Sequence, residues 1–159
     1  MVDLNRILVP TDFSDASAAA LKYGCELADA LHAELCVLHV VENPYPLGVH
    51  TEFYSPPQEY LDRRDRQARE HLDALLTPEQ KERHHAALEL RHGEPAREIL
   101  RYLYEHGAVH LVVMATHGRG GVARLMVGSV ADKIVRMAPC PVVTVRVPDA
   151  HEPGTSRAA

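Results

Sequence analysis

The chain has 159 residues, enough for one domain with a sizeable core, and its 46% hydrophobic and 25% charged residues are typical of a soluble globular protein. A formal net charge of −5 argues against a protein that binds nucleic acids or anionic membranes through a broad basic surface. Because no apolar run is long enough to span a membrane and residues 1–6 lack a signal-peptide pattern, we expect a cytoplasmic protein.

Strands and helices alternate in the first half of the chain. Residues 6–10 (RILVP) predict a short buried strand that ends at the proline. Ser14 is a candidate N-cap for the helix that follows. The expected apolar face of this helix consists of Ala20, Leu21, Gly24, Leu27, Ala28 and Leu31. Residues 34–41 (ELCVLHVV) predict a second buried strand, and the proline-rich segment 42–57 predicts a long loop.

The second half continues the alternation. A polar helix follows the loop, with an exposed 62–66 segment and an inward face expected at Leu61, Ala68, Leu72, Leu75 and Leu76. Thr77–Pro78 predicts a further helical turn. Strands are predicted at 86–91, 110–115 and 142–147. One helix is predicted from Pro95, with an apolar face at Ala96, Ile99, Leu100 and Leu103, and another is predicted at 129–137. We expect one domain over residues 1–148 and a disordered tail at 149–159.

This alternation predicts an α/β fold with a doubly wound, five-stranded parallel sheet and helices on both faces, as in Rossmann-like proteins. In the strand order 3-2-1-4-5, the order reverses between the first and fourth strands. Ligands of such sheets bind outside the carboxyl ends of the strands at that reversal. Residues 10–12 and 116–118 leave these two strands, so we expect both segments at one crevice.

The segment 116–121 (THGRGG), followed by Gly128–Ser129, has the character of a phosphate-binding turn. Glycines let the backbone approach an anion, and the N-terminus of the next helix favours negative charge. Arg119 and Arg124 could neutralise phosphates. The alternative is a surface turn in which Ser129 caps the helix and forms a capping box with Asp132. The spacing matches neither a Walker A motif nor GxGxxG.

Asp12 could accept a hydrogen bond from a ribose hydroxyl or a base amino group, or reach a bound cation. Alternatively, it complements the dipole of the following helix. The eleven histidines, His117 among them, are scattered, and no HExxH motif or Cys/His cluster predicts a metal site. The three cysteines form no CxxC pair and are expected to be reduced core residues. We predict no catalytic and no metal-ligating residue.

Five segments together carry a family pattern. They are 7–14 (ILVPTDFS), 38–40 (LHV), 93–95 (GEP), 139–145 (PCPVVTV), and a G-x2-G-x9-G-[ST] signature at Ala115, Gly118, Gly128 and Ser129, in which alanine replaces the first glycine. With these segments, residues 4–147 resemble the ATP-binding subgroup of the universal stress protein family, whose fold is that of the adenine nucleotide alpha hydrolases.

The resemblance implies a cytosolic stress-response regulator that binds ATP, AMP or ADP, with magnesium, and that acts on a protein partner through binding rather than fast catalysis. It implies that adenosine is surrounded by Pro10, Thr11, Asp12, Val40, Met114 and Ala115. It implies that the phosphates are held by Gly118, Gly128, Ser129 and Val130, and Arg119 is the further candidate there because of its charge.

Other functions compete with this interpretation. An ATPase or nucleotidyl transferase of the same fold would need Asp12, His117 or Ser129 for acid–base or nucleophilic chemistry, and the sequence indicates no base–nucleophile pair. Some members of the family do not bind ATP, so a protein-interaction module is a second alternative. A phosphorylated receiver is disfavoured because the third strand ends in Arg91–His92 rather than in acidic residues.

The last predicted strand, 142–147, lies at an edge of the sheet in the order 3-2-1-4-5. An edge strand leaves backbone groups unpaired, and four of its six residues are valine. We expect it to pair with the same strand of a second copy, which forms a symmetric homodimer. The alternative is that the 149–159 tail folds back over this edge.

Overall fold

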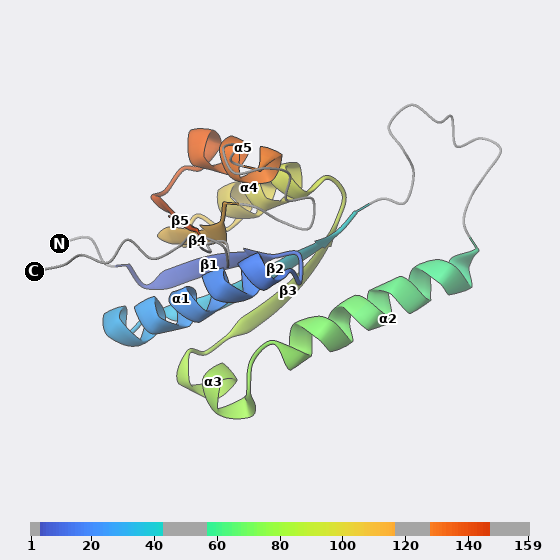
Figure 1. Cartoon of the computed structure of the whole chain (residues 1–159), viewed down its shortest axis with the longest axis horizontal. Helices are drawn as coiled ribbons and strands as arrows, with labels where there is room; N and C mark the ends of the chain where they lie inside the picture. The colour runs from blue at the N-terminus through green and yellow to red at the C-terminus, as the bar shows by residue number, and fades with distance from the viewer. Residues whose placement is uncertain (1–3, 43–56, 117–127, 147–159) are drawn as a thin grey trace, which may run out of the picture.

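Within residues 4–42, 57–116 and 128–146, which the computed structural model describes, five parallel strands form one sheet in the order β3-β2-β1-β4-β5 (Figure 1). Their bounds are β1 (Arg6–Thr11), β2 (Glu34–Val41), β3 (Ala87–His92), β4 (Leu111–Ala115) and β5 (Val142–Val145). The predicted fold class and strand order are confirmed. The third and fourth strands begin one residue later than predicted, and the third ends one residue later.

Helices cover both faces of this sheet. α1 (Asp15–Leu31), α2 (Gln58–Ala74) and the short α3 (Pro78–Arg83) lie on one side, and α4 (Pro95–Glu105) and α5 (Ser129–Met137) lie on the other (Figure 1). Alternate strand residues therefore enter two cores: Ile7 and Val9 pack with α1, whereas Leu8 packs with α4 and α5. Burial on both faces explains why the inner strands are continuous apolar runs.

α1 begins and packs largely as its sequence predicts. Ser14 is the N-cap, and its side chain accepts a hydrogen bond from the backbone N–H of Ser17. Gly24 faces Val9 so closely that a Cβ there would lie 2.7 Å from Val9 Cγ2. Leu31 is the exception to the predicted apolar face, because it is 40% exposed at the last turn, beside the left-handed C-cap His32.

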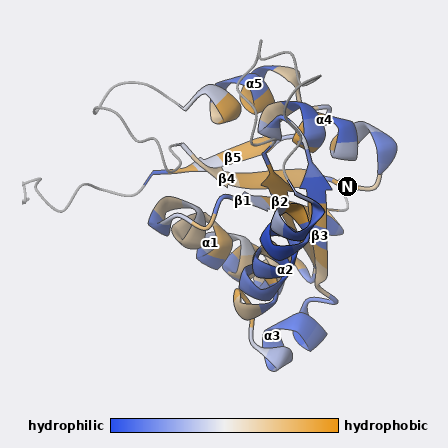
Figure 2. Cartoon of the chain, turned by 90° about the vertical axis from the view of Figure 1, so that its right-hand side faces the viewer, coloured by the Kyte–Doolittle hydropathy of each residue, from blue (hydrophilic) through white to orange (hydrophobic). Residues whose placement is uncertain are grey.

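α2 buries apolar side chains against the sheet mainly through its second half. Ala68 and Leu72 are its buried residues, and Leu76, just beyond it, is also buried, whereas Leu61 and Leu75 are only partly buried. The first turns of α2 extend past the sheet, and Figure 2 shows that this helix is mainly hydrophilic. Thr77 caps α3 in a capping box with Gln80, as the Thr–Pro pair predicts. Most of the predicted 42–57 loop, Val147 and the 149–159 tail lie outside the described residues.

All three cysteines lie in the described part of the chain and are free thiols, Cys25 and Cys36 buried and Cys140 partly buried. Burial raises the pKa of Cys36 to about 11, although the Tyr102 hydroxyl, 3.1 Å from its sulfur, opposes this rise. The thiol is therefore protonated near neutral pH. The predicted core position is confirmed for Cys25 and Cys36, whereas Cys140 is only partly buried. Among the helices of the described residues, none is long and apolar enough to cross a membrane.

Candidate functional site

The sheet opens between β1 and β4 at their carboxyl ends. Backbone pairing of these strands is limited to Ile7 with Leu111 and Leu8 with Val112. On the outer sides, β1 pairs with β2 as far as Thr11, and β4 pairs with β5 as far as Ala115. The two central strands therefore separate where the strand order reverses, which is the usual ligand position in doubly wound sheets.

Pro10 gives a physical reason for this opening. Peptide groups of β1 point alternately to its two neighbours: the Asn5 carbonyl accepts from Glu34 N, and the Arg6 carbonyl accepts from His110 N. By this alternation, position 10 faces β4, and proline has no N–H to continue the ladder there. The prediction that the strand ends at Pro10 is wrong by one residue, because β1 continues through Pro10 to Thr11 on its β2 side.

The turn after β1 is held by short polar contacts. Asp12 Oδ1 accepts hydrogen bonds from Ser14 N at 3.0 Å and from Ser14 Oγ at 2.5 Å. The Thr11 hydroxyl is buried, lies 3.1 Å from Ser17 Oγ, and accepts from Phe13 N at 3.1 Å. The Thr11 side chain therefore fastens the start of α1, and its hydroxyl is directed toward α1.

α5 begins directly beside the carboxyl end of β4. Gly128 N donates to the Thr116 carbonyl at 2.7 Å, and Thr116 N donates to the Val145 carbonyl at 3.1 Å. The N-cap is Gly128, which offers no side-chain cap, and the exposed Ser129 is the first helical residue. The capping box of Ser129 with Asp132 is therefore wrong, and Asp132 instead bonds Arg136 Nε at 3.0 Å.

This start leaves room for an anion at the N-terminus of α5. The backbone N–H of Asp132 bonds the Gly128 carbonyl, so the earlier N–H groups, those of Ser129, Val130 and Ala131, have no partner within the helix. Such groups, together with the helix dipole, favour a bound phosphate. The side chain of Lys133 on the next turn lies 3.4 Å from Oε1 of Glu94, the N-cap of α4.

Apolar candidate residues gather on the α4–α5 side of the crevice. Val40 of β2 and Met114 of β4 are buried in the same cluster, and Val130 of α5 packs against it. Ala115 ends β4 and is partly buried. The structure thus brings together Pro10, Thr11, Asp12, Val40, Met114, Ala115, Gly128, Ser129 and Val130 around one edge of the sheet. Gly118 and Arg119, with His117 and Arg124, lie outside the described residues.

Two aromatic side chains at this edge were not among the residues predicted for the site. Phe13 adopts a left-handed backbone conformation, with φ of 62°, and its ring lies 4.2 Å from the His39 ring, centroid to centroid. His39 Nδ1 is 2.8 Å from the Thr11 carbonyl oxygen. The sequence does carry one signal for His39, which is a polar residue inside the apolar run of β2. The strand register places it opposite Thr11.

A cavity of 360 Å³ lies at the opposite, amino-terminal edge of the sheet, lined among others by Arg6, Glu34, Glu89, Tyr102 and His106. Arg6 and Glu34 form an ion pair there, 2.6 Å between Arg6 Nη2 and Glu34 Oε2. We place the candidate site at the carboxyl edge, where the strands separate and a helix begins. No group of three or more possible metal-ligating side chains is present in the described residues.

Comparisons with known proteins identify a family and a fold. The model of the universal stress protein family matches residues 4–146. Universal stress protein YxiE of Bacillus subtilis is 35% identical over 147 residues, which cover 89% of this chain and 99% of that protein. The structure of universal stress protein UspA from Lactobacillus plantarum has a TM-score of 0.72 at 26% identity and covers 92% of this chain and all of that one.

Two further solved structures contain nucleotides. A universal stress protein from Archaeoglobus fulgidus, in complex with dAMP, has a TM-score of 0.56 at 20% identity and covers 91% of this chain and 98% of that one. A universal stress protein in complex with cAMP has a TM-score of 0.63 at 19% identity, with the same two coverages. At 19% and 20% identity, the likeness of this chain to these two proteins shows a shared fold alone.

Proposed function

This chain belongs to the universal stress protein family, and from that premise we propose that it binds an adenine nucleotide, ATP in the first place, in the crevice between β1 and β4. The observation that carries the proposal is the separation of these strands beyond Leu8 and Val112, next to a helix N-terminus without a side-chain cap. Structures of the same fold that contain dAMP and cAMP support adenine as the base.

Each part of the crevice suits one part of the nucleotide. Pro10, Val40 and Met114 are buried apolar residues that would border an adenine ring, and Asp12 would offer a carboxylate to the ribose hydroxyls. Gly128, Ser129 and Val130 offer backbone N–H groups to the phosphates at the start of α5. Gly118 and Arg119 would complete the phosphate site from the 117–127 segment. Magnesium, when bound, would supply positive charge beside the phosphates.

In this proposal the protein acts as a cytoplasmic stress-response regulator through occupancy of the crevice. A ligand shifts a protein between conformations only by its difference in affinity for them. In the described part of the crevice, the Asp12 carboxylate accepts hydrogen bonds from Ser14 of the same turn, where it supports the start of α1, and this structural role favours binding over rapid turnover. A surface altered by the bound nucleotide would then be recognised by a protein partner.

Addition of millimolar ATP with magnesium is expected to raise the thermal midpoint of unfolding, because a ligand that binds only the folded state stabilises it by mass action. Phosphate release in the same samples is expected below about 1 s⁻¹, the low end of ordinary enzyme rates. Thermal shift, calorimetry and a phosphate assay measure these outcomes. Absence of both shift and heat would exclude the binding proposal, and turnover at ordinary enzyme rates that Asp12→Ala removes would favour the ATPase.

We also propose a homodimer that forms through β5. This strand is the edge of the sheet next to β4, and its valines are only partly buried in the single chain. Val143→Lys with Val145→Lys is expected to give monomers, because two lysines on each copy would repel across the paired strands. Light scattering measures the mass. A monomeric unmodified protein, or a double variant that remains dimeric, would show that β5 is not the interface.

A further inference from the structure

The turn that carries Asp12 is connected to α2 by three rings in contact with one another. Phe13 lies directly after Asp12, and its ring contacts His39 of β2, at 4.2 Å between centroids, and His71 of α2, at 5.4 Å. The Phe13 and His71 rings meet edge to face, with an interplanar angle of 75°. We name these three side chains, Phe13, His39 and His71, the ring stack.

Phe13 holds a backbone conformation that it would not choose by itself. Its φ of 62° is unfavourable for a bulky L-residue. Such strain persists only where surrounding contacts impose it. Here the contacts are the two histidine rings on one side and the hydrogen bond from Phe13 N to Thr11 Oγ1 on the other.

His39 fixes the same turn from the neighbouring strand. Its Nδ1 lies 2.8 Å from the Thr11 carbonyl oxygen, and a carbonyl accepts, so this nitrogen carries the proton and donates. The imidazole ring thus contacts Thr11 through its edge and Phe13 through its face. Removal of either contact would loosen the residues on both sides of Asp12.

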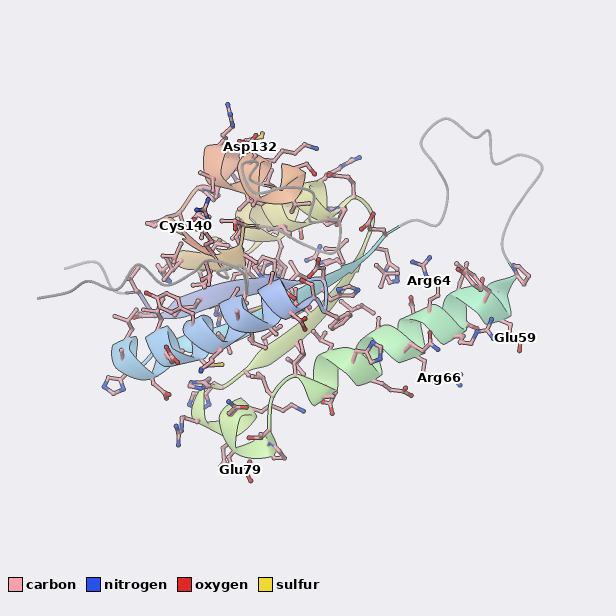
Figure 3. The ribbon with its side chains drawn as sticks, in the orientation of Figure 1. Glu59, Arg64, Arg66, Glu79, Asp132 and Cys140 are labelled. Atoms are coloured by element: carbon pink, nitrogen blue, oxygen red, sulfur yellow. The ribbon has the colours of Figure 1, made fainter. Side chains whose placement is uncertain are left out.

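α2 itself is held to the sheet by few contacts near this stack. Asp65 bonds His92 of β3 at 2.8 Å, and Arg64 Nη2 donates to the Glu42 carbonyl at 3.0 Å. Figure 3 shows Arg64 on the side of α2 toward the sheet and Arg66 on the opposite side. Because the first turns of α2 extend past the sheet (Figure 1), this helix packs through its later turns, where Ala68 and Leu72 are buried and His71 contacts Phe13.

From this arrangement we infer that the ring stack positions the Asp12 turn for the nucleotide and couples occupancy of the crevice to the packing of α2. The inference rests on the proposed function. Coupling of this kind is reciprocal: whatever His71 contributes to nucleotide affinity, the nucleotide contributes equally to the attachment of α2. Phe13 and His39 act as positioning residues, and α2 is the element that reports the bound state.

His71→Ala tests this inference, since His71 is exposed on α2 and is separate from the nucleotide-binding residues. Loss of one aromatic contact is expected to weaken ATP binding about threefold to tenfold in calorimetry. His71→Phe keeps the ring and is expected to restore the affinity. Glu70→Ala, on the neighbouring exposed position, is the matched control and is expected to bind like the unmodified protein.

Hydrogen exchange gives the reciprocal measurement. ATP is expected to slow amide exchange in the 64–74 part of α2 in the unmodified protein and to have little effect there in His71→Ala. Unchanged affinity in His71→Ala, failure of His71→Phe to restore it, or equal slowing of α2 in both proteins would overturn the inference.

A measurement without nucleotide separates this inference from the proposed function. His71→Ala is expected to move the amide resonances of Phe13 and Ser14 and to speed exchange of the Phe13 amide, which bonds Thr11 Oγ1. If these amides do not respond, the positioning role fails even if ATP binds. If they respond but the unmodified protein binds no adenine nucleotide, the proposed function fails, and with it the coupling.

Discussion

Gly24→Val is expected to lower the free energy of unfolding by about 3 kcal/mol, the upper end of the usual cost of overpacking a core. A Cβ at this position would lie 2.7 Å from Val9 Cγ2. Val9 cannot yield easily, because it is fully buried and its branched side chain has few rotamers. The greater helix propensity of the new residue, worth less than about 1 kcal/mol over glycine, is too small to offset this clash.

Denaturant unfolding monitored by circular dichroism measures this effect. Gly107→Val is the matched control, because a Cβ at Gly107 meets nothing within 4 Å. The control is expected to change the free energy of unfolding by no more than about 0.5 kcal/mol, as is usual for surface substitutions. Equal stability of the two variants would mean that α1 does not approach β1 as closely as the structure indicates.

Gly128→Val is expected to weaken ATP binding by roughly tenfold to 100-fold, which corresponds to the loss of one charged hydrogen bond of about 1.5–3 kcal/mol. The backbone of Gly128, with φ of −55° and ψ of 148°, is one that valine adopts without strain. Glycine is therefore not required there for its conformation, and we attribute it to the close approach of a ligand. A side chain would move the phosphates away from the first N–H groups of α5.

Calorimetry on folded Gly128→Val gives this result, with Gly107→Val again as control. Ala115→Gly, which restores the family's first glycine, is expected to bind ATP equally well or more tightly. Binding that survives in Gly128→Val but is lost in Ala115→Gly would place the phosphates elsewhere.

Local pattern in the sequence was sufficient for most of the elements. Short apolar runs located most of the strands and period-3.6 apolar spacing located the helices, with most boundaries within a residue or two, because these patterns reflect how each element is buried. Capping chemistry is equally local, so Ser14 and Thr77 identified the helix starts that the structure has. The two loops expected at one crevice could also be proposed from sequence, once a strand order was chosen.

Contacts between distant segments were decided only by the tertiary structure. Ser129 satisfied the capping pattern, yet Gly128 is the N-cap, and its N–H donates to the carbonyl of Thr116, the residue after β4. Local rules predicted that the first strand ends at Pro10. In the structure Pro10 ends the backbone pairing only toward β4, since the side that a peptide group faces depends on the neighbouring strands. The ring stack joins Phe13 to residues 26 and 58 positions away, and no local pattern carries such a contact.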